Sequence, residues 1–199
     1  MPKIKMTSRL DIAKLSKHIA AIRIGFGVIW IIDAAFKFEP VFYRGLLQYV
    51  KSKDSGEPKW LNPWFHTWYS IIGSNQHLFA VILIVAESLV AVSLLFGLAR
   101  RSSYLLGGVM AFLIWGVGEA FGGPYVSGST DVGAGIIYCF VFAMLFVADG
   151  VIQPSWALDN ILSKKISWWS KIADFKFKFN PPKSVKSGKL VTGKVVSHN

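Results

Sequence analysis

The chain has 199 residues, of which 53% are hydrophobic, with a mean hydropathy of +0.45 and a formal net charge of +11. Ordinary soluble domains are less apolar and more evenly charged, so this composition indicates a membrane protein and excludes a typical soluble enzyme. The excess of Lys and Arg lies at the margins of the apolar runs, where membrane topology alone requires it. The positive charge therefore does not predict a nucleic-acid partner.

Four apolar runs are long enough to cross ~30 Å of hydrocarbon, and they cover residues 18–36, 77–98, 103–121 and 132–152. The first follows a basic segment, but it is long, contains Arg23 and Asp33, and lacks an obvious small-residue cleavage site. We therefore interpret it as a retained span and not as a signal peptide. The expected fold is all-α: a polytopic membrane protein whose four transmembrane helices form an antiparallel bundle with short interfacial helices.

The distribution of Lys and Arg predicts the orientation, because positively charged flanks stay on the cytoplasmic side. With both termini inside, the cytoplasmic segments hold 16 Lys and Arg residues and the outer segments hold five. The loop between the third and fourth spans has none. We expect a multi-pass protein of the plasma membrane, with both termini cytoplasmic and the 122–131 turn outside.

The expected organisation has four parts. Residues 1–17 form a basic cytoplasmic N-terminus, and residues 18–152 form the membrane domain, which includes an outer interfacial loop at 38–76. Residues 153–180 form a cytoplasmic interfacial amphipathic segment, and residues 181–199 form a polar, basic tail that we expect to be mobile. Anionic lipid headgroups are the expected partners of this tail.

The outer loop is predicted to contain two helices that lie on the bilayer surface, near 41–50 and 63–72. The first has apolar residues at helical spacing. The second opens with Asn62 as N-cap and Pro63 at the first helical position. Trp64 and Trp68 follow at i and i+4, which is typical of an interfacial aromatic belt; a ligand-binding aromatic box is the alternative.

Ionisable residues within spans mark candidate sites, because a charge in hydrocarbon costs several kcal/mol unless it is paired or hydrated. By depth, Arg23 is expected in the inner third of span one and Glu87 near the middle of span two. The others lie near the outer surface: Asp33, Lys37, Glu119 and Asp131. Asp33 and Lys37 are four residues apart, which brings two side chains together on a helix. Glu87 with Arg23 is either a structural ion pair or part of a proton relay.

The third span carries a ridge of small residues, Ser103, Gly107 and Ala111, which allows another helix to approach closely. Trp115 and Glu119 continue the same face, so Glu119 is expected to point towards span one. Glu119, Asp33 and Lys37 then form a candidate outer catalytic pocket. Snorkelling of Glu119 to water is the alternative.

The glycine-rich turn after Glu119 leads to two more candidates. Asp131 is interpreted as the N-cap of span four, and an acid of the outer pocket is the alternative. Tyr125 is expected to line the same outer pocket as Glu119.

Several chemistries are not supported by the sequence. Cys139 cannot form a disulfide within the chain, and His66 and His77 have no partner at metal-ligand spacing, so we assign no metal. The histidines lie outside the core of the spans, where a haem ligand would be needed, and no dinucleotide fingerprint is present. Any redox role would therefore need a bound quinone or a partner subunit that holds the cofactor.

Three segments together resemble a known family. They are "RIGFGVIWIIDAAFKFEPVF" in span one, "LIVAESLVAVSLLFGLARR" in span two and "IWGVGEAFGGPYVSGSTDVGAGIIY" across spans three and four. Over roughly residues 18 to 150 the chain resembles the DoxX/DoxD-like family of four-helix membrane proteins, which includes the membrane subunit of an archaeal thiosulfate:quinone oxidoreductase. The resemblance implies a quinone-linked respiratory role, with Glu87 and Arg23 as family-like polar positions.

These observations give three hypotheses. The first is a membrane subunit of a respiratory, quinone-linked oxidoreductase complex that carries no cofactor of its own and works with other membrane subunits. Its quinone-binding or structural polar positions would be Glu87, Arg23, Trp115 and Tyr125. The second is a structural or assembly subunit of a larger respiratory or oxygenase complex. The third, a small-solute transporter, lacks the expected inverted repeats and broken spans.

Overall fold

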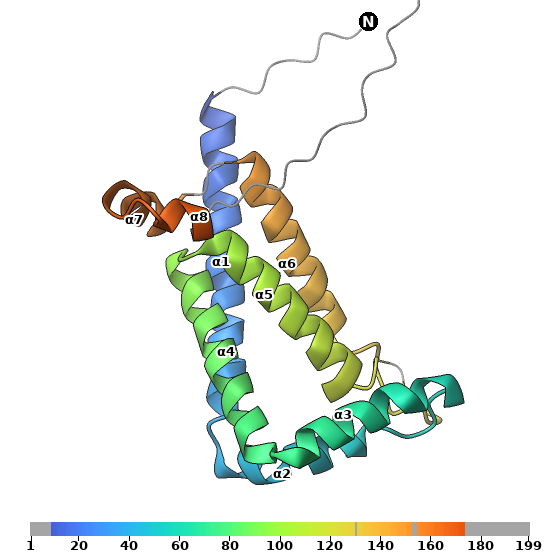
Figure 1. Ribbon diagram of the computed structural model, residues 1–199. Coiled ribbons are helices and arrows are strands. Elements are labelled where there is room, and N and C mark those ends of the chain that lie inside the picture. Colours follow the sequence, from blue (N-terminus) through green and yellow to red (C-terminus); the bar gives the residue numbers. More distant parts are fainter. Residues whose placement is uncertain (1–8, 130, 153–154, 174–199) are drawn as a thin grey trace, which may run out of the picture.

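The computed structural model describes residues 9–129, 131–152 and 155–173, and within these ranges every regular element is a helix. Four longer helices lie alongside one another and alternate in direction: α1 (Arg9–Phe36), α4 (Gln76–Phe96), α5 (Arg100–Leu113) and α6 (Ala134–Val151) (Figure 1). Three of them, α1, α4 and α6, are long and apolar enough to cross a membrane. The all-α class is therefore confirmed for the described residues, and the length and composition of these three helices indicate a membrane protein.

The helix of the predicted third span is interrupted. α5 has 14 residues, and it continues directly into a five-residue π-helical turn, η2 (Ile114–Gly118). The wider turn leaves backbone carbonyls without their usual partners. The indole of Trp64 supplies one partner, because its Nε1 donates to the carbonyl of Gly116 at 2.8 Å.

The long helices pack around a core of large side chains. α1 packs along α4, and α5 packs along α6. Phe26 and Trp30 of α1 make edge-on ring contacts with Phe142 of α6, with ring centroids 5.0 and 5.1 Å apart. The same core includes further buried residues from α4, α5 and α6: Val90, Ala91, Leu94, Tyr104, Met110, Ala111 and Leu145.

The small-residue ridge of α5 faces α6. A Cβ atom at Gly107 would overlap the ring of Phe142, and one at Gly135 would lie 2.8 Å from Trp115. Ala111 is fully buried on this face. The expectation of a close helix contact is confirmed, but the partner is α6, and not span one as predicted. Spans three and four are joined by a short connection, which makes them antiparallel neighbours.

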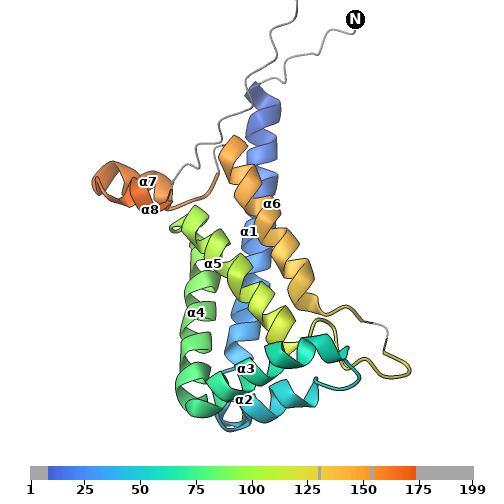
Figure 2. The same cartoon turned by 45° about the vertical axis from the view of Figure 1, so that its right-hand side comes forward.

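Two shorter helices cross the end of the molecule where α1 ends and α4 begins. α2 (Pro40–Ser52) and α3 (Asn62–Ser74) run across the direction of the long helices, and a short 3₁₀ turn, η1 (Lys59–Leu61), precedes α3 (Figure 2). Both predicted loop helices are present. The side chain of Gln76, at the start of α4, accepts from the amide of Leu47 at 3.1 Å and donates to the carbonyl of Tyr43 at 2.8 Å, which attaches α2 to α4.

The opposite end carries a docked C-terminal segment, residues 155–173. It contains α7 (Asp159–Lys165) and α8 (Trp169–Ala173), which extend sideways beside the turn between α4 and α5 (Figures 1 and 2). The predicted basic tail, 181–199, lies outside the described residues.

Candidate functional site

Glu87 lies in the middle of the buried face of α4. Five residues at alternating spacings of four and three form this face, and each is at most 3% exposed: Ala80, Ile84, Glu87, Ala91 and Leu94. Such spacing keeps side chains on one stripe of a helix, and α1 packs along α4. The carboxylate is 0% exposed. A charge in this position is costly unless an opposite charge reaches it.

Lys37 supplies that opposite charge. Its ammonium lies 2.8 Å from Oε2 of Glu87 and 2.7 Å from Oδ2 of Asp33. The contact with Asp33 is the one that the four-residue spacing predicted. Glu87 is buried, whereas the Asp33 side chain is 44% exposed. These three residues, the outer cluster, therefore reach from the buried interior of the helix packing to its surface.

The outer cluster has an unequal charge balance. When all three groups are ionised, two carboxylates share one ammonium, and the uptake of one proton makes the cluster neutral. Oε1 of Glu87 has no hydrogen-bond partner among the described residues, and neither has Nε1 of Trp30, on the helix α1 that packs along α4. Trp30 is 1% exposed. Buried polar groups are normally satisfied, so one free acceptor and one free donor in the core call for an explanation.

Glu119 does not join this cluster. Its Oε2 accepts from the amide of Gly135, in the first turn of α6, at 3.0 Å. Among the described residues no hydrogen bond or ion pair connects Glu119 with Asp33 or Lys37. Glu119 therefore satisfies one of the free amides at the start of α6, which gives it a structural role.

Asp131 is not the helix cap that the sequence predicted. Its Oδ1 accepts from the amide of Gly133 at 3.0 Å, two residues away and before α6 begins, and Asp131 is exposed. The distant Glu119 reaches the first turn of α6 instead. Glu119 lies at the end of the third span, 16 residues before Gly135, but its carboxylate is next to the first turn of α6 in the folded chain.

Two further candidates make bonds within the outer loops. Trp115 donates from Nε1 to the carbonyl of Val132 at 2.8 Å. The hydroxyl of Tyr125 donates to the carbonyl of Phe121 at 2.8 Å, and Tyr125 is 45% exposed. Both side chains stabilise the turn that leads into α6, and neither lies in the outer cluster.

Tyr49 of α2 is influenced electrostatically both by Glu119 and by Asp33 and Lys37 of the outer cluster. Partial burial raises the pKa of Tyr49 above its ordinary value, the carboxylates of Glu119 and Asp33 add to the rise, and Lys37 opposes it. Electrostatic influence of this kind extends over several ångströms. Glu119 and the outer cluster are therefore in the same region of the molecule, although they are not bonded.

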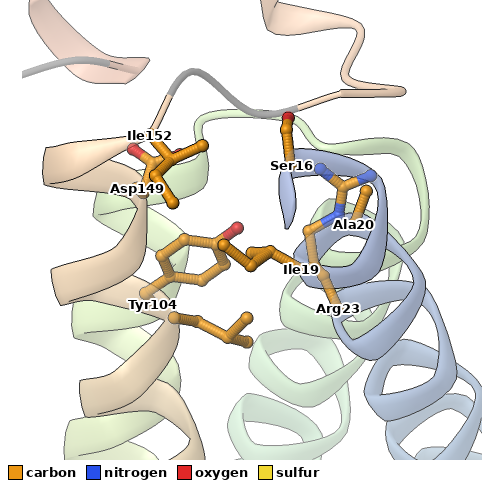
Figure 3. A pocket seen from close by; sticks show the side chains of 8 residues that line it. Ser16, Ile19, Ala20, Arg23, Tyr104, Asp149 and Ile152 are labelled. Carbon is orange, nitrogen blue, oxygen red and sulfur yellow. The ribbon is translucent and has the colours of Figure 1, made fainter. Parts of the chain in front are cut away.

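Arg23 lies at the other end of the long helices. Its Nε donates to the carbonyl of Leu94 at 2.9 Å and its Nη2 to that of Trp156 at 2.7 Å. It lines a small pocket with Tyr104 and Asp149 (Figure 3). The pocket has a volume of about 10 Å³, which holds about one water molecule and no quinone. Arg23 pairs with backbone carbonyls, and the predicted pair of Arg23 with Glu87 is not formed.

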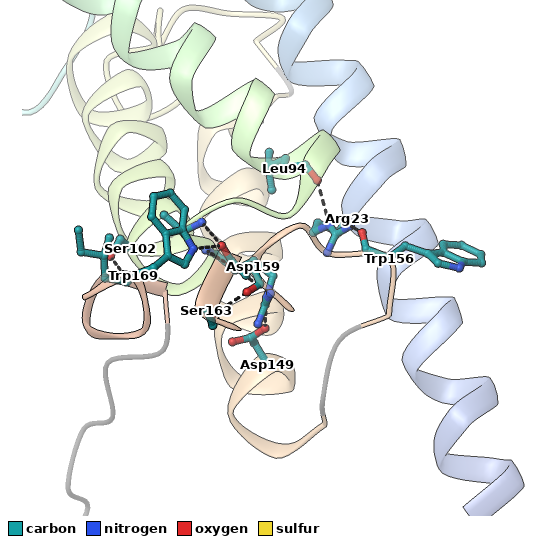
Figure 4. A network of polar contacts seen from close by, with 11 residues as sticks. Arg23, Leu94, Ser102, Asp149, Trp156, Asp159, Ser163 and Trp169 are labelled. Carbon is teal, nitrogen blue, oxygen red and sulfur yellow. Dashed lines mark hydrogen bonds and ion pairs between the residues drawn. The ribbon is translucent and has the colours of Figure 1, made fainter. Parts of the chain in front are cut away.

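A second polar cluster, which the sequence analysis did not identify, attaches the docked C-terminal segment. Nε of Arg100 lies 2.8 Å from Asp149, and its Nη1 lies 3.1 Å from Asp159. Asp159 also accepts from the amides of Ala99 and Arg100 and from Nε1 of Trp169 (Figure 4). We call Arg100, Asp149 and Asp159 the inner cluster. Opposite charges at the start of span three and the end of span four were the available signal, but Arg100 was counted only as a membrane flank and Asp149 was not considered.

The structure gives no metal centre in the part of the chain that it describes: no group of three or more His, Cys, Asp or Glu side chains could hold a metal ion. Cys139 is a free thiol on α6 and lies 3.5 Å from the carbonyl of Gly108. The outer cluster, with two carboxylates and one ammonium, is suited to proton exchange and not to metal binding.

Comparison with known proteins identifies no family: no family model, no curated protein and no solved structure matches the chain. The similarity to the DoxX/DoxD-like family therefore stays a prediction. The functional argument depends on the two clusters themselves.

Proposed function

We propose that the chain is a four-span membrane subunit of a quinone-linked oxidoreductase complex, with Glu87 as its proton-exchanging group. The fourth span in this proposal is α5 with η2, a helical run from Arg100 to Gly118. The proposed orientation places both termini in the cytoplasm, Asp33 and Lys37 towards the external face of the plasma membrane, and Glu87 deeper within it. The basic asymmetry of the sequence supports this orientation.

One observation carries the proposal: a fully buried carboxylate in the apolar face of α4 shares its one ion-pair partner among the described residues with a second carboxylate. Intramembrane acids are costly to keep and are a mark of proton pathways. A purely structural pair would be complete with one acid and one base. The additional acid, Asp33, is partly exposed and offers protons a route from Glu87 to the surface.

The free polar atoms suit a quinone headgroup in chemical type. Reduction of a quinone takes two electrons and two protons, and it converts each carbonyl into a hydroxyl. The indole N–H of Trp30 can donate to a carbonyl, and the carboxylate of Glu87 can accept from a hydroxyl. The electrons would come from a partner subunit that holds a redox cofactor, because no residue set for such a cofactor is present in the described chain.

The test is quinone turnover by membranes that carry Glu87→Gln at matched protein levels. Gln keeps the size and one acceptor but cannot carry the proton, so we expect turnover to fall by about 100-fold, in the range of lost acid–base catalysis. Unchanged turnover would reject Glu87 as the proton carrier.

Matched controls use the other two acids. Asp33→Asn removes a partly exposed charge and should reduce turnover much less than Glu87→Gln. Glu119→Gln keeps an acceptor for Gly135 and should leave turnover near the wild-type value. A loss in Glu119→Gln as large as in Glu87→Gln would return the catalytic role to Glu119.

A structural or assembly subunit is the second candidate, and a specific observation favours it. Arg23, Trp115, Tyr125 and Glu119 all bond to backbone groups of the same chain. Side chains used in this way hold helices and turns together, which suits a scaffold. Under this function Glu87→Gln would lower the amount of assembled complex but not the turnover of each complex.

A further inference from the structure

The docked C-terminal segment is held rigidly to the turn between α4 and α5. Backbone amides of Leu158 and Asp159 donate to the carbonyls of Phe96 and Gly97 at 3.0 and 3.1 Å. Ser102 donates to the carbonyl of Ile172 at 2.6 Å, and Asp159 is 1% exposed. The segment is therefore fixed from both of its ends.

Although it is fixed, the segment leaves a large apolar surface uncovered by the described residues. Trp156 is 59% exposed, and Ile161 and Trp168 are each 53% exposed. Large apolar side chains left exposed commonly mark an interaction surface.

The charge of the segment has one sign. Its three exposed ionisable side chains are all lysines: Lys164, Lys165 and Lys171. The one acidic residue between Ser155 and Ala173 is Asp159, and its charge is already paired with Arg100. The exposed aromatic and aliphatic groups thus lie among positive charges that no acid of the segment neutralises.

The position of the segment matches a bilayer boundary. α7 and α8 extend sideways at the level where α4 ends and α5 begins (Figures 1 and 2). α4 is one of the helices long and apolar enough to cross a membrane, and it ends at Phe96, whose carbonyl bonds to the segment. In a bilayer crossed by α4, the segment would lie at the boundary between hydrocarbon and headgroups.

We propose that residues 155–173 form an anionic-phospholipid binding platform. Trp156, Ile161 and Trp168 enter the boundary between acyl chains and headgroups, as amphipathic aromatic residues do. The lysines extend to the lipid phosphates, with their aliphatic stems along the apolar surface. Lysines near an anionic surface each strengthen binding several-fold, so three of them give a clear preference for anionic over zwitterionic lipid.

The experiment places a fluorescent reporter on the platform of the full chain. Ser167→Cys, in a Cys139→Ser background, is labelled with bimane, because Ser167 is exposed and its replacement leaves every proposed anchor intact. The protein is reconstituted in nanodiscs with phosphatidylcholine or phosphatidylglycerol that carries bromine on the upper acyl chain. We expect quenching by both lipids, with about twofold stronger quenching by brominated phosphatidylglycerol in mixed discs.

Three variants decide the role of charge. Lys164→Gln, Lys165→Gln and Lys171→Gln combined should reduce the ratio of the two quenching strengths to about one, whereas the same three changes to Arg should keep it. Lys14→Gln with Lys17→Gln, which removes exposed charge from α1, should leave it unchanged. If the labelled protein that keeps all of these lysines showed equal quenching by both lipids, the proposed preference for anionic lipid would be overturned. No quenching by either lipid would show a water-exposed or protein-covered surface and overturn the platform.

Discussion

At the residue scale, the ammonium of Lys37 is the group on which the outer cluster depends. It is the ion-pair partner of Glu87 and also holds Asp33. Removal of one partner of a buried pair leaves an uncompensated charge, which costs more than the pair itself contributed. The contact of Lys37 with the buried Glu87 should therefore affect the free energy of unfolding much more than its contact with the partly exposed Asp33.

Lys37→Met should lower the free energy of unfolding by about 3–5 kcal/mol, because Glu87 would stay buried without a counter-charge. In the double variant Lys37→Met with Glu87→Gln, most of this loss of unfolding free energy should be recovered, because the amide that replaces the Glu87 carboxylate is neutral. Asp33→Asn should cost less than about 1 kcal/mol, as exposed pairs do. Glu87→Gln alone completes the comparison. Thermal unfolding in one detergent checks the wild type and these four variants, and strictly additive costs of Lys37→Met and Glu87→Gln would show that the two residues are not coupled.

Glu119 offers a second prediction at this scale. Glu119→Ala removes the acceptor from the first turn of α6 and should cost about 1 kcal/mol, as the loss of a helix cap does. Glu119→Gln, which keeps an oxygen acceptor, should cost little. Asp131→Ala serves as the comparison, because its bond to Gly133 lies outside the helix. If Asp131→Ala proved the more costly change, the sequence prediction of its capping role would be restored.

At the element scale, sequence patterns that repeat along a single helix predicted the structure well. The apolar runs predicted α1, α4 and α6 closely, and the spacing of four predicted the Asp33–Lys37 contact. It could not predict which helix meets which. The small-residue face of α5 was recognised, but its partner was wrong, because a ridge of glycine and alanine accommodates any neighbouring helix.

The inner cluster was missed for the same reason. Arg100 and Asp149 are 49 residues apart, and only the packing of α5 on α6 brings them together. A count of charges for topology treats such residues as solvated flanks. Arg100, at 3% exposed, is instead part of the buried network that attaches the docked C-terminal segment.

Asp159→Ala should release this segment. It removes the contact with Arg100 and the acceptor for two backbone amides and one indole. We expect a loss of about 3–5 kcal/mol in docking, as for other broken buried pairs, and rapid proteolytic cleavage within residues 155–173. Ser167→Ala, at an exposed position of the same segment, is the matched control. Equal resistance of both variants to protease would show that Asp159 does not hold the segment.

At the scale of the whole molecule, the proposed four-span arrangement makes a topological prediction. Ser127, in the chain before α6, and Ser167, between α7 and α8, are both exposed. The docked segment and the start of α6 lie at opposite ends of the long helices (Figure 1). In a Cys139→Ser background, Ser127→Cys should react with an impermeant maleimide in intact cells, and Ser167→Cys should react only after permeabilisation. Reaction of both cysteines from the same side would require an even number of spans between them and would contradict a membrane-spanning α6.

The protonation of Glu87 during quinone turnover is the most direct test of the proposed function. Infrared difference spectra of the assembled complex in membranes, recorded as quinone is reduced, report the carbonyl stretch of protonated carboxylic acids. We predict a band that changes on reduction, shifts in heavy water and is absent in Glu87→Gln. Identical difference spectra for the wild type and Glu87→Gln would contradict a proton-exchanging role for Glu87.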